Sequence, residues 1–311
     1  MAFDIILVVL LLGVAIWTIA ARDTFAAVVG FVVFGLLLAL AWMRLAAPDV
    51  ALTESALGSG LTGGLLLGAS TRLARSAAPA PSEEPGGSLR LAAAALCALV
   101  SAGLAALVLL LPEPAPTLAP QAMVNIAATG LGNPVTAVLM AFRAIDTLLE
   151  AVVLLLALVC IWSLAPDRLW GGLPGRRHRA DPNGLLTFIA QILVPVGILV
   201  GIYIFWIGSV APGGEFQGAT ILAAMWVLAA MAGLVDAPPV SGRRLRLMLA
   251  AGPAVFSTIG LAGFATAGTF LAYPEPHAKL LILTIEVPLT LSIAATLALL
   301  VAGPPEPASE R

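Results

Sequence analysis

Charge is scarce in this sequence: only 10% of its 311 residues are Asp, Glu, Lys or Arg, and Lys279 is the only lysine. Cysteine is rarer still, since only Cys97 and Cys160 occur, both inside apolar runs and outside any CxxC or Cys/His cluster. We interpret both as small buried hydrophobic residues and expect neither a disulfide nor a metal site. The two histidines, His178 and His277, have no partner at metal-ligand spacing.

Sequence motifs for independent chemistry are also missing. The chain has no glycine-rich phosphate loop, no haem attachment site, no zinc-ligand spacing and no nucleophile elbow. We therefore expect no catalytic residues, no cofactor and no metal, and a protein that is not itself an enzyme. A formal net charge of −2 gives no indication of nucleic acid as a partner.

Apolar residues dominate what is present: 60% of the chain is hydrophobic, and the mean hydropathy is +1.06. About 20 apolar residues make a helix long enough to cross the hydrocarbon core, and a helix satisfies its own backbone hydrogen bonds in lipid. The first run lacks a basic start and contains Asp4, so it is interpreted as a retained helix and not a signal peptide. The sequence predicts an all-α integral membrane protein with about nine spans, at residues 3–20, 25–43, 50–71, 91–111, 145–164, 185–208, 216–235, 246–272 and 279–302.

The basic residues predict the orientation of these spans. If the N-terminus lies outside, twelve of the 15 basic residues fall in connections on the cytoplasmic side. Loops rich in Lys and Arg stay in the cytoplasm, so we expect the N-terminus outside and the C-terminus in the cytoplasm. The twelve are Arg22, Arg72, Arg75, Arg90, Arg168, Arg176, Arg177, Arg179, Arg243, Arg244, Arg246 and Arg311.

Two polar connections divide the spans into three groups. The stretch RSAAPAPSEEPGGSLR is rich in Pro, Gly and Ser and has little tendency to order. The basic stretch APDRLWGGLPGRRHRADPNG follows the fifth span. We expect a three-helix block (1–75), a linker (76–90), a two-helix block (91–165), a basic cytoplasmic loop (166–184), a four-helix domain (185–303) and a tail (304–311).

Small residues recur at helical spacing in two spans. Gly60, Gly64 and Gly68 share one face of the third span, and Gly197 and Gly201 repeat the pattern in the sixth. Because small residues let helix backbones approach closely, the first set predicts a face that holds a neighbouring helix.

Six ionisable residues lie within or beside the spans, where a charge is costly and is therefore a candidate for function. Arg143 is spaced to pair with Asp146 on one helix face, which Glu150 shares. Glu150 and Glu286 lie deepest, and a carboxyl group there can exchange protons near neutral pH. A place in a cation or proton path and a purely structural bond both stay open for the set, which comprises Glu150, Glu286, Glu54, Asp146, Arg143 and Asp49.

The stretch APGGEFQGAT, residues 211–220, is a polar turn between two long apolar runs. Its proline ends one helix, and its first two glycines supply free backbone angles. Glu215 opens the next helix, where the dipole accounts for its charge and its removal is expected to cost about 0.3–1 kcal/mol. The features predict a tight capped turn and not, by themselves, a binding site; the turn comprises Pro212, Gly213, Gly214, Glu215, Phe216, Gln217 and Gly218.

This turn resembles the PGGGFQGG signature of the B subunit of Mrp-type (multiple resistance and pH) cation/proton antiporters. The resemblance covers about residues 185–302, and Glu286 in TIEVPLT is similar to that family's Ile-Glu-Leu/Val-Gly stretch. It implies a four-helix membrane domain and sodium or protons as the transported ion.

The two earlier blocks resemble components of related complexes. APDVALTESALGSGLTGGLLL is similar to the C-terminal region of the Mrp A subunit and to the D subunit of archaeal membrane-bound hydrogenases. NPVTAVLMAFRAIDTLLEAVVLL is similar to the segment found as the E subunit in those hydrogenases. The chain departs from these motifs where Ala141, Ala144 and Leu149 replace an Asp and two Gly, and where Glu215 replaces the turn's third Gly.

The resemblance implies a membrane subunit of a complex-I-related, Mrp-type cation/proton translocating assembly, contributing a lateral ion path and an assembly surface. Expected partners are the lipid bilayer, large antiporter-like subunits and small subunits like Mrp C, E, F and G, in the cell inner (plasma) membrane. Two alternatives stay open. One is an accessory membrane subunit of a membrane-bound hydrogenase or other redox-driven ion pump, and the other is a purely structural scaffold.

Overall fold

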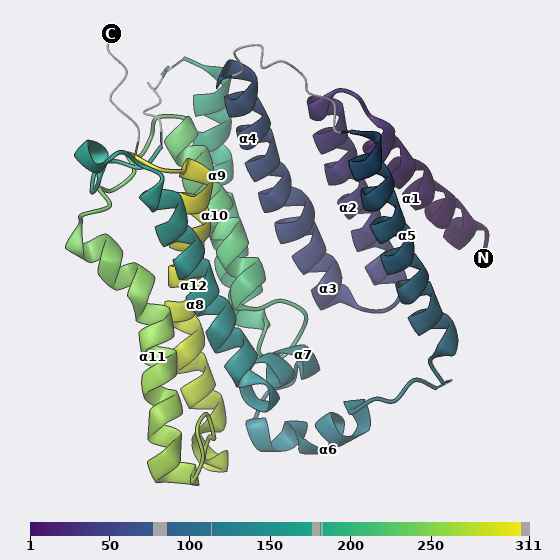
Figure 1. Cartoon of the computed structure of the whole chain (residues 1–311). Coiled ribbons are helices and arrows are strands. Elements are labelled where there is room, and N and C mark those ends of the chain that lie inside the picture. Colours follow the sequence, from purple (N-terminus) through teal and green to yellow (C-terminus); the bar gives the residue numbers. More distant parts are fainter. Residues whose placement is uncertain (77–85, 113, 176–180, 182, 306–311) are drawn as a thin grey trace.

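A computed structural model describes residues 1–76, 86–112, 114–175, 181 and 183–305 (Figure 1). These residues form helices and connections, with no β-strand among them. Eight helices are long and apolar enough to cross a membrane. The predicted all-α membrane fold is therefore confirmed. The remaining residues, which include Arg176, Arg177, Arg179, Arg311 and most of the predicted linker and tail, lie outside the described part of the chain.

Eight of the nine predicted spans correspond to these long helices. The remaining predicted span, 216–235, corresponds to α10 (Glu215–Met231), whose 17 residues rise only about 26 Å, slightly less than the hydrocarbon core. α10 lies against both α9 and α12, so its sides are covered by protein. The long helices are α1 (Ala2–Ala20), α2 (Thr24–Arg44), α3 (Pro48–Thr53) continuing through the π-helix η1 (Glu54–Leu61) into α4 (Thr62–Ser76), α5 (Gly87–Leu110), α8 (Ala144–Ser163), α9 (Leu185–Ile207), α11 (Arg243–Ala267) and α12 (Ala278–Ala302).

Between α5 and α8 the sequence predicted only an outer connection, and the structure places further helices there. α6 (Ala119–Thr129) is followed by α7 (Pro134–Ala137) and the π-helix η2 (Val138–Phe142), and the two parts meet at 88°. Gly130, with φ of 68°, ends α6, and Pro134 begins α7. Figure 1 shows both at the lower end of the molecule, between the lower ends of α5 and α8.

The long helices and α10 run in alternating directions, so the two termini lie toward opposite ends of the bundle (Figure 1). Which end faces the cytoplasm stays a prediction from the basic residues. Two short 3₁₀ turns complete the described connections, η3 (Asp167–Leu169) after α8 and η4 (Glu275–His277) before α12.

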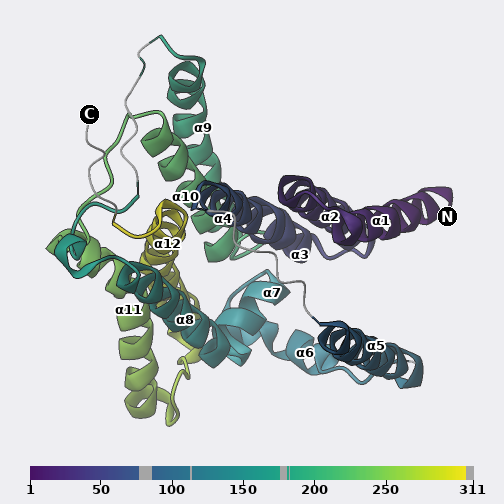
Figure 2. The same cartoon turned by 45° about the horizontal axis from the view of Figure 1, so that its top comes forward.

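α12 is the central helix of the core. In its span, Glu275–Ala302, 72% of the residues in the apolar stretch of 18 residues are buried, against 6% in α1 and none in α5. α8, α10 and α11 pack around α12, whereas α1, α2 and α5 extend away from this group (Figure 2). Because α5 has no buried residue within the described structure, its apolar surface requires lipid or other membrane subunits as surroundings.

Close helix packing occurs at the glycines of α9. A Cβ atom at Gly201 would lie 3.1 Å from Leu222 and 3.3 Å from the carbonyl oxygen of Gly218. Gly197 likewise faces Met225 of α10. The expectation that Gly197 and Gly201 form a packing face is therefore met within the chain.

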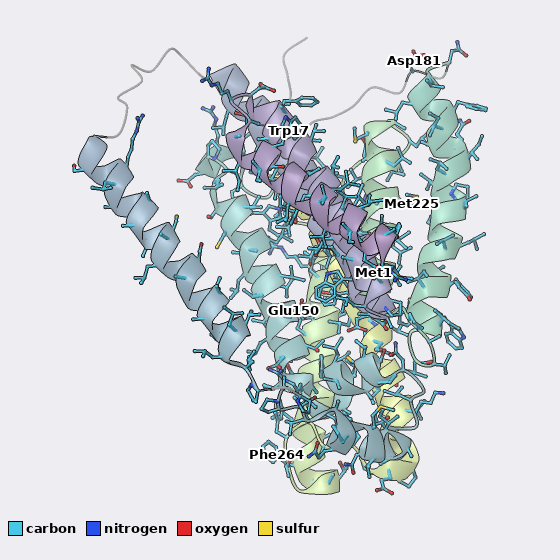
Figure 3. All side chains as sticks on the ribbon, turned by 90° about the vertical axis from the view of Figure 1, so that its right-hand side faces the viewer. Met1, Trp17, Glu150, Asp181, Met225 and Phe264 are labelled. Carbon is cyan, nitrogen blue, oxygen red and sulfur yellow. The ribbon has the colours of Figure 1, made fainter. Side chains whose placement is uncertain are left out.

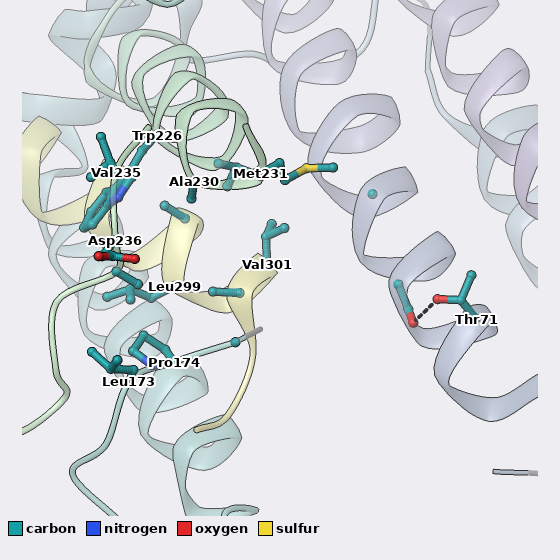
Figure 4. A pocket seen from close by; sticks show the side chains of 17 residues that line it. Thr71, Leu173, Pro174, Trp226, Ala230, Met231, Val235, Asp236, Leu299 and Val301 are labelled. Atoms are coloured by element: carbon teal, nitrogen blue, oxygen red, sulfur yellow. Dashed lines mark hydrogen bonds between the residues drawn. The ribbon is translucent and has the colours of Figure 1, made fainter. Parts of the chain in front are cut away.

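The predicted packing face of α4 meets no neighbouring helix within the described chain, so it stays a prediction for the assembled complex. A Cβ atom at Gly64 or Gly68 would meet no described atom within 4 Å, and one at Gly60 would meet only the carbonyl of Ser55 from its own helix, at 3.2 Å. Gly64 and Gly68 instead line a cavity of about 540 Å³ that also borders α10 and α12 (Figure 4). This cavity separates the α4 backbone from α10 and α12, so no neighbouring helix packs against Gly64 and Gly68.

This contrast predicts opposite outcomes for two glycine substitutions. Gly218→Ala places a Cβ atom 2.8 Å from the carbonyl oxygen of Gly201 and 2.8 Å from Cβ of Phe205, so α9 and α10 must move apart. We expect the free energy of unfolding of the purified protein to fall by about 1–3 kcal/mol, which lowers its melting temperature. Gly64→Ala, the matched control, adds the same methyl group in open space, and equal melting temperatures for the two variants would contradict the packing described.

Candidate ion-path site

The polar turn between α9 and α10 is held by residues from both earlier blocks of the chain. The N–H of Gly213 donates to Oδ1 of Asp49 at 3.0 Å. The side-chain amide of Asn133 donates to the same Oδ1 at 3.3 Å and to the carbonyl of Ala211 at 3.0 Å. Asp49 and Asn133 are 7% and 2% exposed. The turn is polar because it is the junction of three blocks and not because it faces water.

Two further hydrogen bonds strengthen this junction. The amide of Gln217 donates to Oγ1 of Thr53 at 3.0 Å, which ties the first turn of α10 to α3. The hydroxyl of Thr136 donates to the carbonyl of Gly208 at 2.7 Å, which ties α7 to the end of α9. Asp49 was proposed from the sequence as an ion-path candidate. Its carboxylate instead accepts a hydrogen bond that positions the backbone of the turn at Gly213.

The glycines of the turn have a conformational reason. Gly213 and Gly214 adopt φ of 148° and 140°, a region open in practice only to glycine. A Cβ atom at Gly213 would also collide with the carbonyl oxygen of Ile204. The sharp reversal lets α10 begin at Glu215, where the sequence predicted its start.

Glu215 and Glu286 form a buried carboxyl pair. The two residues are 4% and 2% exposed, and their side chains lie within hydrogen-bonding reach of each other. A carboxylate only accepts hydrogen bonds, so a bond between two carboxyl groups requires a proton on one of them. Among the described residues, neither carboxyl forms a salt bridge with Lys or Arg. The geometry thus places two carboxyl groups side by side inside the helix bundle, where one shared proton would satisfy both.

Glu150 extends this pair toward the side of the bundle. It lies on α8, and its side chain is exposed on the described surface (Figure 3). A negative charge on Glu150 acts electrostatically on Glu215. Glu150 stands six residues after the start of α8, roughly 9 Å along the helix axis. Glu150 thus lies at a lateral face of the chain, whereas Glu215 and Glu286 lie in its core.

The other sequence candidates lie away from these three carboxyls. Arg143 and Asp146 form the predicted ion pair, with 2.6 Å between Nε and Oδ2, and both side chains are exposed. Glu54 lies on η1, with its carboxyl against Gly58 and near Gly35 of α2. Of the six candidates, only Glu286 lies in the buried carboxyl pair, and Glu150 lies on the described surface of α8.

Sequence reasoning misjudged Glu215 and missed Tyr273. Glu215 does open α10, but its burial against Glu286 shows that the helix dipole is not its whole role and that its removal is not a mild surface change. The signal was present: an acid stands where the resembling motif has glycine. Tyr273 has a buried hydroxyl without a hydrogen-bond partner in the described structure, and burial, together with the charge of Glu286, raises the pKa of this phenol.

Comparison with known proteins places these residues in two families. Residues 9–75 match the model for the D subunit of MBH (MbhD), and residues 185–303 match the model for a domain related to the MnhB subunit of Na⁺/H⁺ antiporter. The chain therefore joins a region similar to MbhD and a domain similar to MnhB in one fusion. The predicted resemblances of the first block and of the last four helices are confirmed. The MbhD domain supplies Asp49, and the MnhB-related domain supplies both Glu215 and Glu286.

Two solved structures are similar to this MbhD–MnhB fusion. One is the structure of the Mrp complex from Dietzia sp. DQ12-45-1b, with 26% identity and a TM-score of 0.73 over 98% of this chain and 35% of that chain. The other is the membrane-bound sulfane sulfur reductase (MBS), an archaeal respiratory membrane complex, with 24% identity and a TM-score of 0.53 over 68% of this chain and 96% of that chain. The fusion thus spans about a third of the Mrp chain that it matches. No curated protein matches the chain.

Proposed function

We propose that this chain is a membrane subunit of a multi-subunit, Mrp-type cation/proton translocating assembly, to which it contributes a lateral ion path and an assembly surface. The observation that carries the proposal is the similarity of nearly the whole chain to part of the Mrp complex. The family matches at both ends support the same assignment. The cell inner membrane is the proposed location.

The three carboxyls support the ion-path part of the proposal. Ionisable groups at membrane depth are costly and often mark ion or proton pathways. Three such groups are present: Glu150 at the lateral face, and the buried pair Glu215 and Glu286. The only lysine, Lys279, is exposed near the start of α12, so we propose that pumping subunits elsewhere in the assembly drive the transport.

The exposed helices support the assembly-surface part. α5 has no buried residue within the described structure, and only 6% of the apolar stretch of α1 is buried. Their apolar faces are available to large antiporter-like subunits and to small subunits like Mrp C, E, F and G. The two-helix block 91–165, proposed to be similar to the E subunit of the hydrogenases, contains most of α5.

The chains that co-purify with this protein in mild detergent test the proposal. With a C-terminal affinity tag, we expect antiporter-like membrane subunits in near-equal amounts, and we expect a harsher detergent to release them. Purification of the chain alone under mild conditions would contradict a subunit role. Co-purifying iron–sulfur and nickel subunits would instead favour the accessory subunit of a redox-driven pump.

A further inference from the structure

A cavity of about 580 Å³ lies between α6 and the connection that enters α12. It is lined by several polar side chains, among them Gln121, Asn125, Thr129, Tyr273 and Glu275. It lies at the α6 end of the bundle, beside the start of α12. A roomy cavity with several polar partners is a place where water is retained.

Tyr273 connects this cavity to the buried carboxyl pair. Its side chain lines the cavity, while its hydroxyl oxygen is buried and has no hydrogen-bond partner in the described structure. A buried unpartnered hydroxyl is costly, and such a group calls for an explanation. Burial and the nearby charge of Glu286 raise the pKa of Tyr273, so the phenol keeps its proton at neutral pH and remains able both to donate and to accept.

We propose that this cavity is the port through which protons reach the Glu215–Glu286 pair, and that the Tyr273 hydroxyl is the group that joins them. In one transfer the phenol takes a proton from cavity water and passes its own proton, through a water between the two side chains, to the Glu286 carboxylate, so Tyr273 ends neutral. The water is left as hydroxide, or as water if it arrived as hydronium. The inference rests on the proposed ion-translocating function and adds the ion and its entry point.

The charged groups around the pair fit this assignment. α8 contributes Glu150 and the α11–α12 connection contributes Tyr273. Glu54 of η1 packs on Gly58 and lies away from the pair. The sequence of α9 holds no charged residue, and the arginines of α11 stand at its far end, at Arg243, Arg244 and Arg246.

The first arm of the test removes only the hydroxyl. Tyr273→Phe keeps the ring and its packing, and Tyr203→Phe is a matched control because Tyr203, the only other tyrosine, is 60% exposed on α9. In inverted vesicles containing the whole complex, we expect cation-coupled proton flux to fall roughly tenfold or more in Tyr273→Phe, as when a positioned proton-transfer group is lost. Tyr203→Phe should match the wild type.

The second arm blocks the port without touching the pair. Ala128→Phe fills the cavity, and Ala127→Phe places the same side chain on the neighbouring exposed position of α6 that does not line it. The readout is the rate at which a water-soluble carbodiimide labels Glu286, measured by mass spectrometry in the intact complex. We expect Ala128→Phe to slow both labelling and flux several-fold, and Ala127→Phe to change neither.

The outcomes separate this inference from the proposed function. If Glu286→Gln abolishes flux while Tyr273→Phe and Ala128→Phe retain it, protons enter elsewhere and the port is wrong, but the ion path stands. If Glu286→Gln retains full flux in a normally assembled complex, the ion path and the port both fall. Slow labelling and low flux in Tyr273→Phe and Ala128→Phe, with both control variants unchanged, support the port.

Discussion

Glu286→Gln is expected to assemble normally and yet lose most cation-coupled proton flux. Glutamine keeps the shape of the side chain and most of its hydrogen bonding, but it carries neither the exchangeable proton nor the charge. Because Glu286 is 2% exposed and paired with Glu215, bulk solvent has little direct access to its position. We expect flux in inverted vesicles to fall by roughly 10²-fold or more, as for loss of a positioned acid–base group.

The same experiment with Glu150→Gln and Glu215→Gln is expected to give comparable losses. The matched control is Asp146→Asn, because Asp146 shares α8 with Glu150 but is exposed and ion-paired with Arg143. If the carboxyls only tie helices together, all four variants should transport nearly as well as the wild type at normal assembly levels. That result would exclude the ion path and favour the alternative that the chain is a purely structural scaffold.

Asp49→Ala is expected to cause the largest loss of stability among single substitutions at the junction. It removes the acceptor shared by the Gly213 N–H and the Asn133 amide and leaves both donors buried. Each unsatisfied donor costs about 1–3 kcal/mol, so we expect the free energy of unfolding to fall by roughly 2–4 kcal/mol. The fraction of intact complex after heating in mild detergent measures this loss.

Asp49→Asn is the matched control for the junction. Its amide oxygen still accepts from Gly213, so we expect it to lose much less stability than Asp49→Ala. Because Asp49 is not one of the three carboxyls of the proposed path, Asp49→Ala should lower flux only through reduced assembly. Heat resistance equal to the wild type in Asp49→Ala would show that the three blocks are not held there.

The sequence predicts the spans well because the requirement is local: a run of apolar residues in lipid has few alternatives to a helix. The start of α10 at Glu215 follows from the proline and glycines just before it. The Arg143–Asp146 pair follows from helical spacing alone. By contrast, the α6 and α7 helices stand in a proline-rich connection whose length is too short and whose pattern is too broken to predict a membrane crossing.

Contacts between distant blocks lay beyond sequence reasoning. Asp49 and Gly213 are 164 residues apart, and Asn133 and Ala211 are 78 apart. The pairing of Glu215 with Glu286 depends on how α10 and α12 are turned, which apolar periodicity does not specify when both helices are surrounded by apolar residues. The same limit explains Gly64 and Gly68: small residues permit close packing, but only the position of the neighbouring helix decides whether it occurs.

The proton shared by Glu215 and Glu286 is the most direct test of the account. Infrared spectroscopy of the assembled complex at neutral pH detects the carbonyl stretching band of a protonated carboxyl group. We expect such a band in the wild type, shifted by exchange into heavy water, and its loss in the Glu215→Gln/Glu286→Gln double variant, while Asp146→Asn keeps it. A spectrum in which the double variant and the wild type carry the same protonated-carboxyl band would contradict the account.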